Sequence, residues 1–349
     1  MTRRVIFIKV LFLLAVFSHS SKWNFIAGGD LMLNQISAQN NPLLELKDVF
    51  SQCEIVYCNL ETPLTTSITP TKNKSKEDLR QRVQYILKSN PQHAKFLNEV
   101  GINLVSLGNN HTMDFGVRGL SDTINALDEN NMQYTGAGSD YKSAFRPAII
   151  KTSADYKVGM LSFLAFMGTK ALQKCTMATS YQAGIAGLDL KGIIDQNTRK
   201  YLKEIVESTK QKCDFLFISM HWGYEKKEIP RLYQIQLGRA FIDAGADLIV
   251  GSHPHVLQGA EIYKGKPILY SLGNLLASKN QETSLIKLSF VGDSLDKFTL
   301  IPCKIKNRRV LISTENRKIK QKEYFGRLCD KLARKFPHKY SSKPNILVY

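Results

Sequence analysis

The sequence lacks the features that identify several large classes of protein. Beyond the N-terminus, no run of residues is long and apolar enough to cross a membrane. There is no internal repeat of fixed period and no low-complexity tract, which excludes a repeat architecture. The six cysteines form none of the close pairs that bind zinc in small knuckles, and we interpret them as structural. What remains is the composition of an ordinary globular chain, with 43% hydrophobic and 22% charged residues.

Acidic residues are scarce at one end of the chain. The formal net charge is +18, and residues 304–343 carry 14 Lys and Arg against only three acidic residues. The basicity is therefore mostly a property of the C-terminal segment, while the remainder is mildly basic. No nucleic-acid recognition motif accompanies this segment, so we do not expect nucleic acid as a partner.

The N-terminus has the pattern of an export signal, residues 1–20. Arg3 and Arg4 precede an apolar stretch at 5–17, and small residues around Ser20 suit cleavage. This pattern predicts an exported protein, in the periplasm or on the outer face of the cytoplasmic membrane. Thirteen residues are too few to span a bilayer comfortably. An uncleaved anchor and a buried first strand remain the alternatives.

The chain alternates short apolar runs with helical patterns. Near-continuous apolar runs suit strands that are buried on both faces. They occur at 23–30, 54–61, 102–111, 213–223, 246–255 and 267–274. Strands that alternate with helices predict a layered α/β fold with parallel segments. Residues 144–165 are typical of a hairpin instead, and the polar residues 66–80 of a surface loop.

Amphipathic helices are predicted between the runs. They cover 91–101, 119–131 with Ser121 as a cap, 197–212, and 231–245 with Gly245 as a stop signal. A last helix, at 324–340, is basic and has apolar residues on one side, namely Phe325, Leu328, Leu332 and Phe336. It either covers an edge of the domain or attaches the chain to an anionic surface, such as membrane lipid or an acidic polymer.

Residues that bind metals or move protons follow each predicted strand. They are Asp30, Glu61, Asn110, His111, His221, His253 and His255. Open α/β sheets bind ligands at the carboxyl ends of their strands, so these side chains are candidates for one site. Four of the seven histidines of the chain lie at these ends. Each residue alone has a structural explanation, but the recurrence at every strand end favours a site.

The kinds of residue at these ends suit one chemistry. Imidazole, carboxylate and amide oxygens bind divalent metals of the Mn, Zn or Fe class. Two such ions could activate water and neutralise a phosphoryl transition state. His253 and His255 flank Pro254 and would point to opposite sides in an extended chain, unless a bend turns both toward one centre.

Six motifs occur in an order that resembles a known family. They are "GGDLML", "NLETPLT", "LGNNHTMDFG", "HWGYE", "DLIVGSHPHVLQG" and "YSLGN", within residues 24 to 275. Together they resemble the CapA-type capsule (poly-γ-glutamate) synthesis proteins, a branch of the calcineurin-like metallophosphatase superfamily. The resemblance implies a metallophosphatase-like four-layer α/β/β/α sandwich over residues 24–292, with a short basic C-terminal extension at 293–349.

The resemblance also implies a role for each matching residue. Asp30 and His255 would bind a first metal, and Glu61 would bridge it to a second one. The remaining ligands of the second metal would be Asn110, His221 and His253. His111 would then protonate the leaving oxygen, with Asp114 to orient it.

Two positions depart from the superfamily pattern, and the first is Glu61, which stands where the superfamily has a bridging Asp. Ordinary phosphoesterases of the superfamily carry Asp-x-His at the first strand, whereas Met32 occupies the place of that His here. The first metal would therefore lack one imidazole and bind weakly.

Two functions follow from these features. The first is a metal-dependent hydrolase or transferase that acts on an anionic envelope polymer, its precursor or a phosphoester. The second is a non-catalytic, polymer-binding component of a membrane-embedded synthesis and export complex. The presence of His111 and Asp114 favours the first function, and the loss of the Asp-x-His imidazole favours the second.

Overall fold

The computed structural model describes residues 22–37, 39–81, 84–166, 175–190 and 194–349. The predicted export signal lies outside these residues. No helix within the described ranges has the length and apolar character that crossing a membrane requires.

The first of two large sheets has the strand order β16-β15-β14-β1-β2-β3-β4. Its strands are β1 (Lys22–Leu31), β2 (Ile55–Leu60), β3 (Leu104–Ser106), β4 (Gln133–Thr135), β14 (Gln281–Val291), β15 (Ser294–Lys306) and β16 (Arg309–Ile312). Strands β1 to β4 are parallel, whereas β14 to β16 form an antiparallel meander beside β1. Two short strands, β13 (Asn274–Leu276) and β18 (Ile346–Val348), pair with β1 and β15.

The second sheet has the order β17-β11-β12-β10-β9-β7-β6. Its strands are β6 (Ala148–Lys151), β7 (Lys157–Ala165), β9 (Phe215–Trp222), β10 (Leu248–Ser252), β11 (Ala260–Tyr263), β12 (Lys266–Leu269) and β17 (Ser341–Ser342). Strands β7, β9, β10 and β12 are parallel, and β6 and β7 form the predicted hairpin. A separate two-stranded sheet joins β5 (Ala137–Gly138) to β8 (Gly184–Ile185).

Aromatic side chains hold the two sheets together face to face. The Trp23 ring of β1 stacks on Phe290 of β14 with centroids 4.7 Å apart, and it meets Phe215 of β9 edge-on at 4.9 Å. All three side chains are almost fully buried. Burying a ring of this size contributes about 2 kcal/mol, so the cluster is a principal tie between the sheets.

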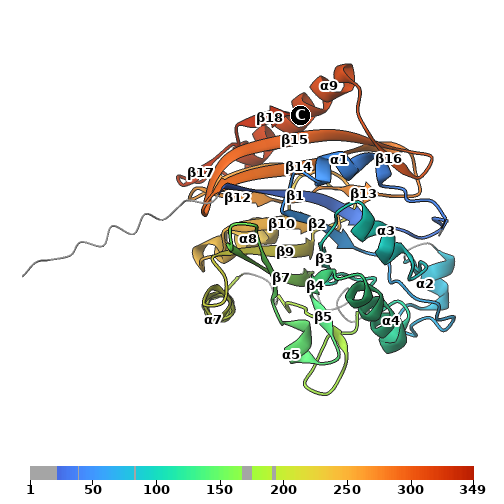
Figure 1. The fold of residues 1–349 in the computed structure, drawn as a ribbon. Coiled ribbons are helices and arrows are strands. Elements are labelled where there is room, and N and C mark those ends of the chain that lie inside the picture. Colours follow the sequence, from blue (N-terminus) through green and yellow to red (C-terminus); the bar gives the residue numbers. More distant parts are fainter. Residues whose placement is uncertain (1–21, 38, 82–83, 167–174, 191–193) are drawn as a thin grey trace, which may run out of the picture.

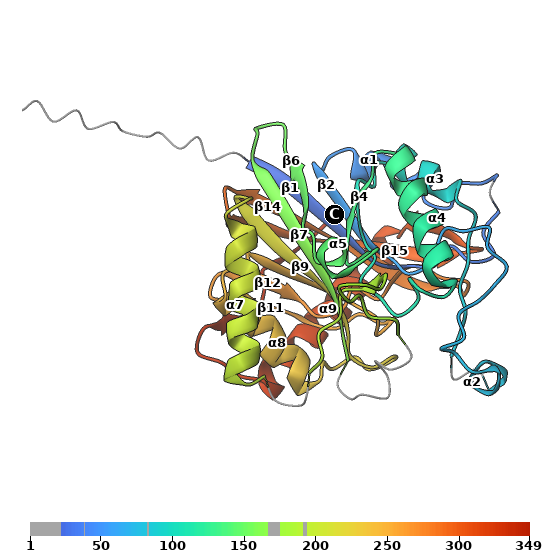
Figure 2. The same cartoon turned by 90° about the horizontal axis from the view of Figure 1, so that it is seen from below.

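Helices cover the outer faces of both sheets (Figures 1 and 2). Helices α3 (His93–Glu99) and α4 (Gly116–Glu129) share an apolar cluster with the first sheet. Helices α7 (Gln196–Lys210) and α8 (Leu232–Asp243) share another with the second sheet. The predicted four-layer α/β/β/α sandwich is confirmed. The other helical segments are short, namely η1 (Leu44–Leu46), α1 (Lys47–Phe50), α2 (Lys76–Arg80) and α5 (Tyr141–Ala144).

One local prediction was wrong, and another holds except at one residue. Ser121 does not cap α4, because the helix begins five residues earlier, at Gly116. The backbone of Gly116 has a φ of +60°, a conformation that favours glycine. The segment 66–80 is exposed over most of its length, as predicted for a surface loop, but the side chain of Lys74 is buried.

The C-terminal segment closes one end of the sandwich. Helix α9 (Glu315–Lys335) begins well before the predicted start at Tyr324. Its buried side chain Phe325 packs near Phe298 of β15, with ring centroids 6.2 Å apart. On the other side, the Ala260 N–H of β11 donates to Cys329 Sγ at 3.3 Å. The apolar side of α9 therefore bridges the two sheets, while most of its basic residues are exposed.

Candidate metal centre

Strand ends from both sheets meet at one edge of the sandwich. Parallel strands end on the same side, so β1, β2 and β3 of the first sheet bring Asp30, Glu61 and Asn110 together. Strands β9 and β10 of the second sheet bring His221 and the 253–255 turn to the same place. Direct contacts between the two groups show that the predicted ligand residues form one cluster.

An amide and two imidazoles form one side of the cluster. His221 Nε2 lies 2.7 Å from Asn110 Oδ1 and 3.1 Å from His253 Nδ1. On its other side, His221 Nδ1 lies 2.9 Å from the Ser252 hydroxyl. Burial and the neighbouring histidines hold the pKa values of His221 and His253 well below the usual range. Both rings are therefore neutral at pH 7, which is the form that binds metals.

Asp30 organises the opposite side. Its Oδ1 accepts a hydrogen bond from Asn59 Nδ2 at 2.8 Å, and its Oδ2 accepts one from the His253 N–H at 3.0 Å. Its Oδ2 also lies 3.0 Å from His255 Nδ1, which in turn contacts Asn274 Oδ1 at 2.9 Å. Burial opposes a charge on His255, but Glu61 and Asp30 outweigh it and raise the pKa of His255 to about 10.

Glu61 lies between the two sides with no hydrogen-bond donor. Both of its oxygens are buried and have no hydrogen-bond partner among the described residues. Its Oε1 lies 3.7 Å from His221 Nε2, and 3.9 Å from both His111 Nε2 and His255 Nε2. These distances are too long for hydrogen bonds. Burial and the nearby Asp30 carboxylate raise the pKa of Glu61 to about 8.

This arrangement fits a bound cation. A buried carboxylate without donors is costly, and a positive ion between it and the imidazoles would remove the cost. Ligand atoms of Glu61, His253 and His255 lie within 4.8 Å of one another, close enough for Glu61 to share bound ions with both histidines. The donor set is oxygen and imidazole nitrogen, without thiolate.

A backbone bend turns the two histidines of "GSHPH" inward. His253 has a φ of +92° and His255 a φ of +57°, values that are uncommon for residues other than glycine. The sequence left open whether these side chains point apart. The bend brings them to one centre, and such local strain is frequent at functional sites.

Glycine permits a close approach next to Asp30. A Cβ atom at Gly29 would lie only 1.9 Å from the carbonyl oxygen of Gly273. That contact holds β1 against the segment that carries Asn274, the partner of His255. Any side chain at residue 29 would push the two strand ends apart.

His111 and Asp114 form a hydrogen-bonded pair beside the cluster. His111 Nδ1 lies 2.8 Å from Asp114 Oδ2, and that oxygen also accepts a hydrogen bond from the Leu87 N–H at 2.7 Å. The Asn109 side chain accepts hydrogen bonds from the backbone N–H groups of His111 and Thr112, each at 3.1 Å. These bonds fix the ring so that Nε2 faces Glu61.

Sequence reasoning missed Lys74, which completes this group. Lys74 Nζ pairs with Asp114 Oδ1, donates to the Tyr85 carbonyl at 2.8 Å, and lies 3.2 Å from His111 Nδ1. Burial and the Lys74 charge lower the pKa of His111, and Asp114 partly opposes this effect. Nothing in the sequence distinguishes Lys74 from its exposed neighbours in the loop.

Other supporting residues had a weak signal or none. Asn109 and Asn274 lie within the motifs "LGNNHTMDFG" and "YSLGN", but no role was predicted for them. Asn59 likewise opens the motif "NLETPLT" without a predicted role. Phe166 had no signal, although its ring lies 4.6 Å from that of His253. Met32 is partly buried against the apolar cluster outside the first sheet.

Comparison with known proteins identifies the family. Residues 24–279 match the family described as "Bacterial capsule synthesis protein PGA_cap". The PGA biosynthesis protein CapA of Bacillus subtilis (strain 168) is 28% identical over 264 residues, which are 74% of this chain and 64% of that protein. The capsule biosynthesis protein CapA of Bacillus anthracis is 29% identical over 256 residues, 72% of this chain and 58% of that one.

This chain thus spans about three-fifths of the length of these two relatives. Among solved structures, the crystal structure of TT1561 of Thermus thermophilus aligns with 79% of this chain and 98% of its own. That alignment has a TM-score of 0.42 at 8% sequence identity. Because the family match covers all the strand ends that carry the cluster, the chain belongs to the bacterial capsule synthesis protein family.

Proposed function

We propose that this protein takes part in the synthesis of an anionic capsule or envelope polymer, such as poly-γ-glutamate, as a metal-dependent hydrolase or transferase. Two relatives named for capsule or PGA biosynthesis support a role in the synthesis of such a polymer. The predicted export signal supports a location outside the cytoplasmic membrane, where such a polymer accumulates. The substrate is the polymer, its precursor or a phosphoester derived from it.

The observation that carries the proposal is the Glu61 carboxylate without donors. Asp30 and His255 would hold one divalent ion and Asn110, His221 and His253 a second, with Glu61 between them. Such ions supply activation of water and neutralise negative charge in the transition state. The contacts of Asp30 with Asn59 and of His255 with Asn274 keep these ligands oriented.

His111 has the geometry of a proton donor and acceptor. Asp114 accepts the Nδ1 proton, which leaves Nε2 as the nitrogen that takes up and delivers a proton. Nε2 lies 3.9 Å from Glu61 Oε1, so it faces the same space as the ligands. A leaving oxygen bound there would receive its proton from His111.

One observation favours a second function, a non-catalytic component that binds polymer. Met32 provides no imidazole where the Asp-x-His enzymes have one, and it packs against an apolar cluster. A site with weakened metal binding would then serve to hold the polymer or stabilise the fold.

Metal analysis together with an activity assay separates the two functions. The purified protein should contain Mn, Zn or Fe, and His253→Ala should lose at least one ion. His338→Ala, at an exposed histidine remote from the cluster, is the control. Equal metal content in wild type and His253→Ala would refute the ligand assignment.

His111→Ala should keep its metal. It should lose about 100-fold activity on phosphodiesters with poor leaving groups and less on activated ones, which need little protonation. Equal losses on both would argue against His111 as the acid. Bound metal without any His111-dependent turnover would favour the polymer-binding function.

A further inference from the structure

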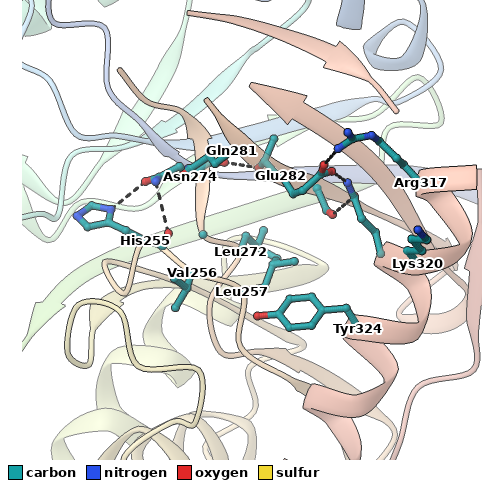
Figure 3. A pocket seen from close by; sticks show the side chains of 14 residues that line it. His255, Val256, Leu257, Leu272, Asn274, Gln281, Glu282, Arg317, Lys320 and Tyr324 are labelled. Carbon is teal, nitrogen blue, oxygen red and sulfur yellow. Dashed lines mark hydrogen bonds and ion pairs between the residues drawn. The ribbon is translucent and has the colours of Figure 1, made fainter. Parts of the chain in front are cut away.

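A cavity of about 650 Å³ leads away from the candidate metal centre. At one end it is lined by His255 and Asn274, whose side chains contact each other. At the other end it reaches α9, where Arg317, Lys320 and Tyr324 line it (Figure 3). A molecule in this cavity would therefore extend from the metal centre to the basic helix.

The middle of the cavity is apolar. Val256 and Leu257 are partly exposed and line it there, between the two polar ends, while the nearly fully buried Leu272 is bridged to Leu257 (Figure 3). The Tyr324 ring lies beside them, and its hydroxyl donates to Glu228 Oε1 at 3.0 Å, which fixes the ring. This surface suits short methylene segments better than continuous charge.

The α9 end of the cavity is cationic. Arg317 pairs with Glu282, which compensates its charge. Lys320 lies one turn further along the helix and is exposed, and no ion pair within the described ranges engages it. Overall, α9 has eight Lys and Arg against three acidic residues. A single uncompensated ammonium beside an apolar surface suits a carboxylate on a flexible chain.

We propose that this cavity binds an extended segment of a polycarboxylate whose charges are separated by short methylene runs, as in γ-linked polyglutamate. The methylenes would contact Val256 and Leu257, a carboxylate would pair with Lys320, and the chain would continue toward His255. The inference rests on the proposed function for its substrate. It assigns the cavity as the binding site through which that substrate reaches the candidate metal centre. Because Glu282 compensates Arg317, the described lining of the cavity offers one unpaired cation, which suits widely spaced single charges better than closely spaced dianionic phosphates.

Binding of a labelled oligomer tests the proposal. Fluorescein-labelled γ-linked oligoglutamate is titrated with the full-length protein at low salt, and anisotropy is recorded. Lys320→Glu should weaken binding about tenfold, as expected for reversing the charge of one partly screened partner. Lys322→Glu is the matched control, because Lys322 is exposed on the same helix but does not line the cavity.

Three outcomes would overturn the proposal. Equal binding by Lys320→Glu and Lys322→Glu would show that the cavity does not select the carboxylate. Retained binding of the uncharged analogue, a γ-linked oligomer whose α-carboxylates are converted to carboxamides, would show that the cavity does not recognise the negative charge. Stronger, Lys320-dependent binding of short-chain inorganic polyphosphate would show that the cavity selects phosphate.

Failure of this inference can be told apart from failure of the proposed function. His253→Ala, which is expected to lose metal, should still bind the oligomer through Lys320. If the wild-type protein contains no metal but binds oligoglutamate in a Lys320-dependent manner, the proposed metal chemistry fails and the cavity assignment stands. If metal and His111-dependent activity are present but Lys320→Glu binds normally, only the cavity assignment fails.

Discussion

The buried pair of Lys74 and Asp114 allows a quantitative prediction. The Lys74 side chain is 5% exposed and that of Asp114 is 1% exposed. Replacing either partner leaves the other charge buried, which costs about 3 to 5 kcal/mol when nothing compensates it. The two replacements should not cost the same, because the remaining partners differ.

Asp114→Asn should be the more damaging change. It removes the carboxylate charge and leaves the buried Lys74 ammonium with only neutral acceptors, the Tyr85 carbonyl and the oxygen of the new amide, besides the nearby His111 ring. We expect a loss of about 4 kcal/mol in the free energy of unfolding. Lys74→Met leaves Asp114 with the Leu87 N–H and His111 Nδ1 as donors and keeps most of the buried side-chain volume. A loss of about 2 kcal/mol is expected.

Urea denaturation measures both effects. The only two tryptophans, Trp23 and Trp222, are buried and report unfolding by fluorescence. Since neither charge remains buried in the double variant, Lys74→Met with Asp114→Asn should cost less than the sum of the single changes, by about 2 kcal/mol. Lys72→Met, at an exposed lysine of the same loop, should stay within about 0.5 kcal/mol of wild type.

The ranking decides whether the reasoning is right. If Lys74→Met costs as much as Asp114→Asn, the remaining donors on Asp114 do not compensate its charge. If Lys74→Met is indistinguishable from Lys72→Met, the buried ion pair does not contribute to stability. Strict additivity of the two single changes would show that the side chains do not interact.

Three further predictions concern the metal centre and α9. In metal-free protein, the pKa of Glu61 is raised from 4.5 to about 8, so the folded state binds the extra proton and stability falls as pH rises from 4.5 toward 8. Glu61→Gln should reduce the slope of unfolding free energy against pH, by at most about 1.4 kcal/mol per pH unit, in urea titrations with chelator. The same slope in wild type and variant would contradict this effect of Glu61. Chelation should lower the melting temperature of wild type, because an ion at 100 times its dissociation constant stabilises the fold by about 2.7 kcal/mol. His221→Ala should lose the ion that Asn110, His221 and His253 would hold and should respond less to chelator than wild type, and a wild-type-like response would exclude His221 as a ligand. Reversing Lys331, Arg334 and Lys335 to Glu should release the protein from anionic vesicles at low salt, since each basic residue near such a surface contributes about 1 kcal/mol. Undiminished vesicle binding would leave α9 with its packing role alone.

The sequence predicted the parts of the fold and site that depend on local pattern. Apolar runs marked the central strands, and the rule that parallel strands end on one side placed Asp30, Glu61 and His221 near one another. The bend that turns His253 and His255 inward follows from tertiary contacts, so periodicity cannot reveal it. Lys74 was missed for a related reason, since its partner Asp114 lies 40 residues away and the loop has no apolar face.

The start of α9 was missed because its first turns lack an apolar stripe. Ile319 is the one large apolar residue before Tyr324, and it is 60% exposed. The helix begins after Thr314, whose backbone is extended and whose side chain makes no capping hydrogen bond, and its first turns are continuous with the buried turns that follow. Hydrophobic periodicity detects only the part of a helix that packs.

The pairing of β1 with β14 has a consequence for how the protein folds. Trp23, near the start of the described chain, lies opposite Phe290 in this pairing, although more than 260 residues separate them. Contacts of such long sequence separation slow folding, because the chain loses entropy before the pairing stabilises it. Strand β1 carries Asp30 and lies between β2 and β14. Both of these strands are available for pairing only after residue 291 has been synthesised. We therefore expect the ligand cluster to form late in folding, and an ion bound there would be acquired where the nearly complete chain folds.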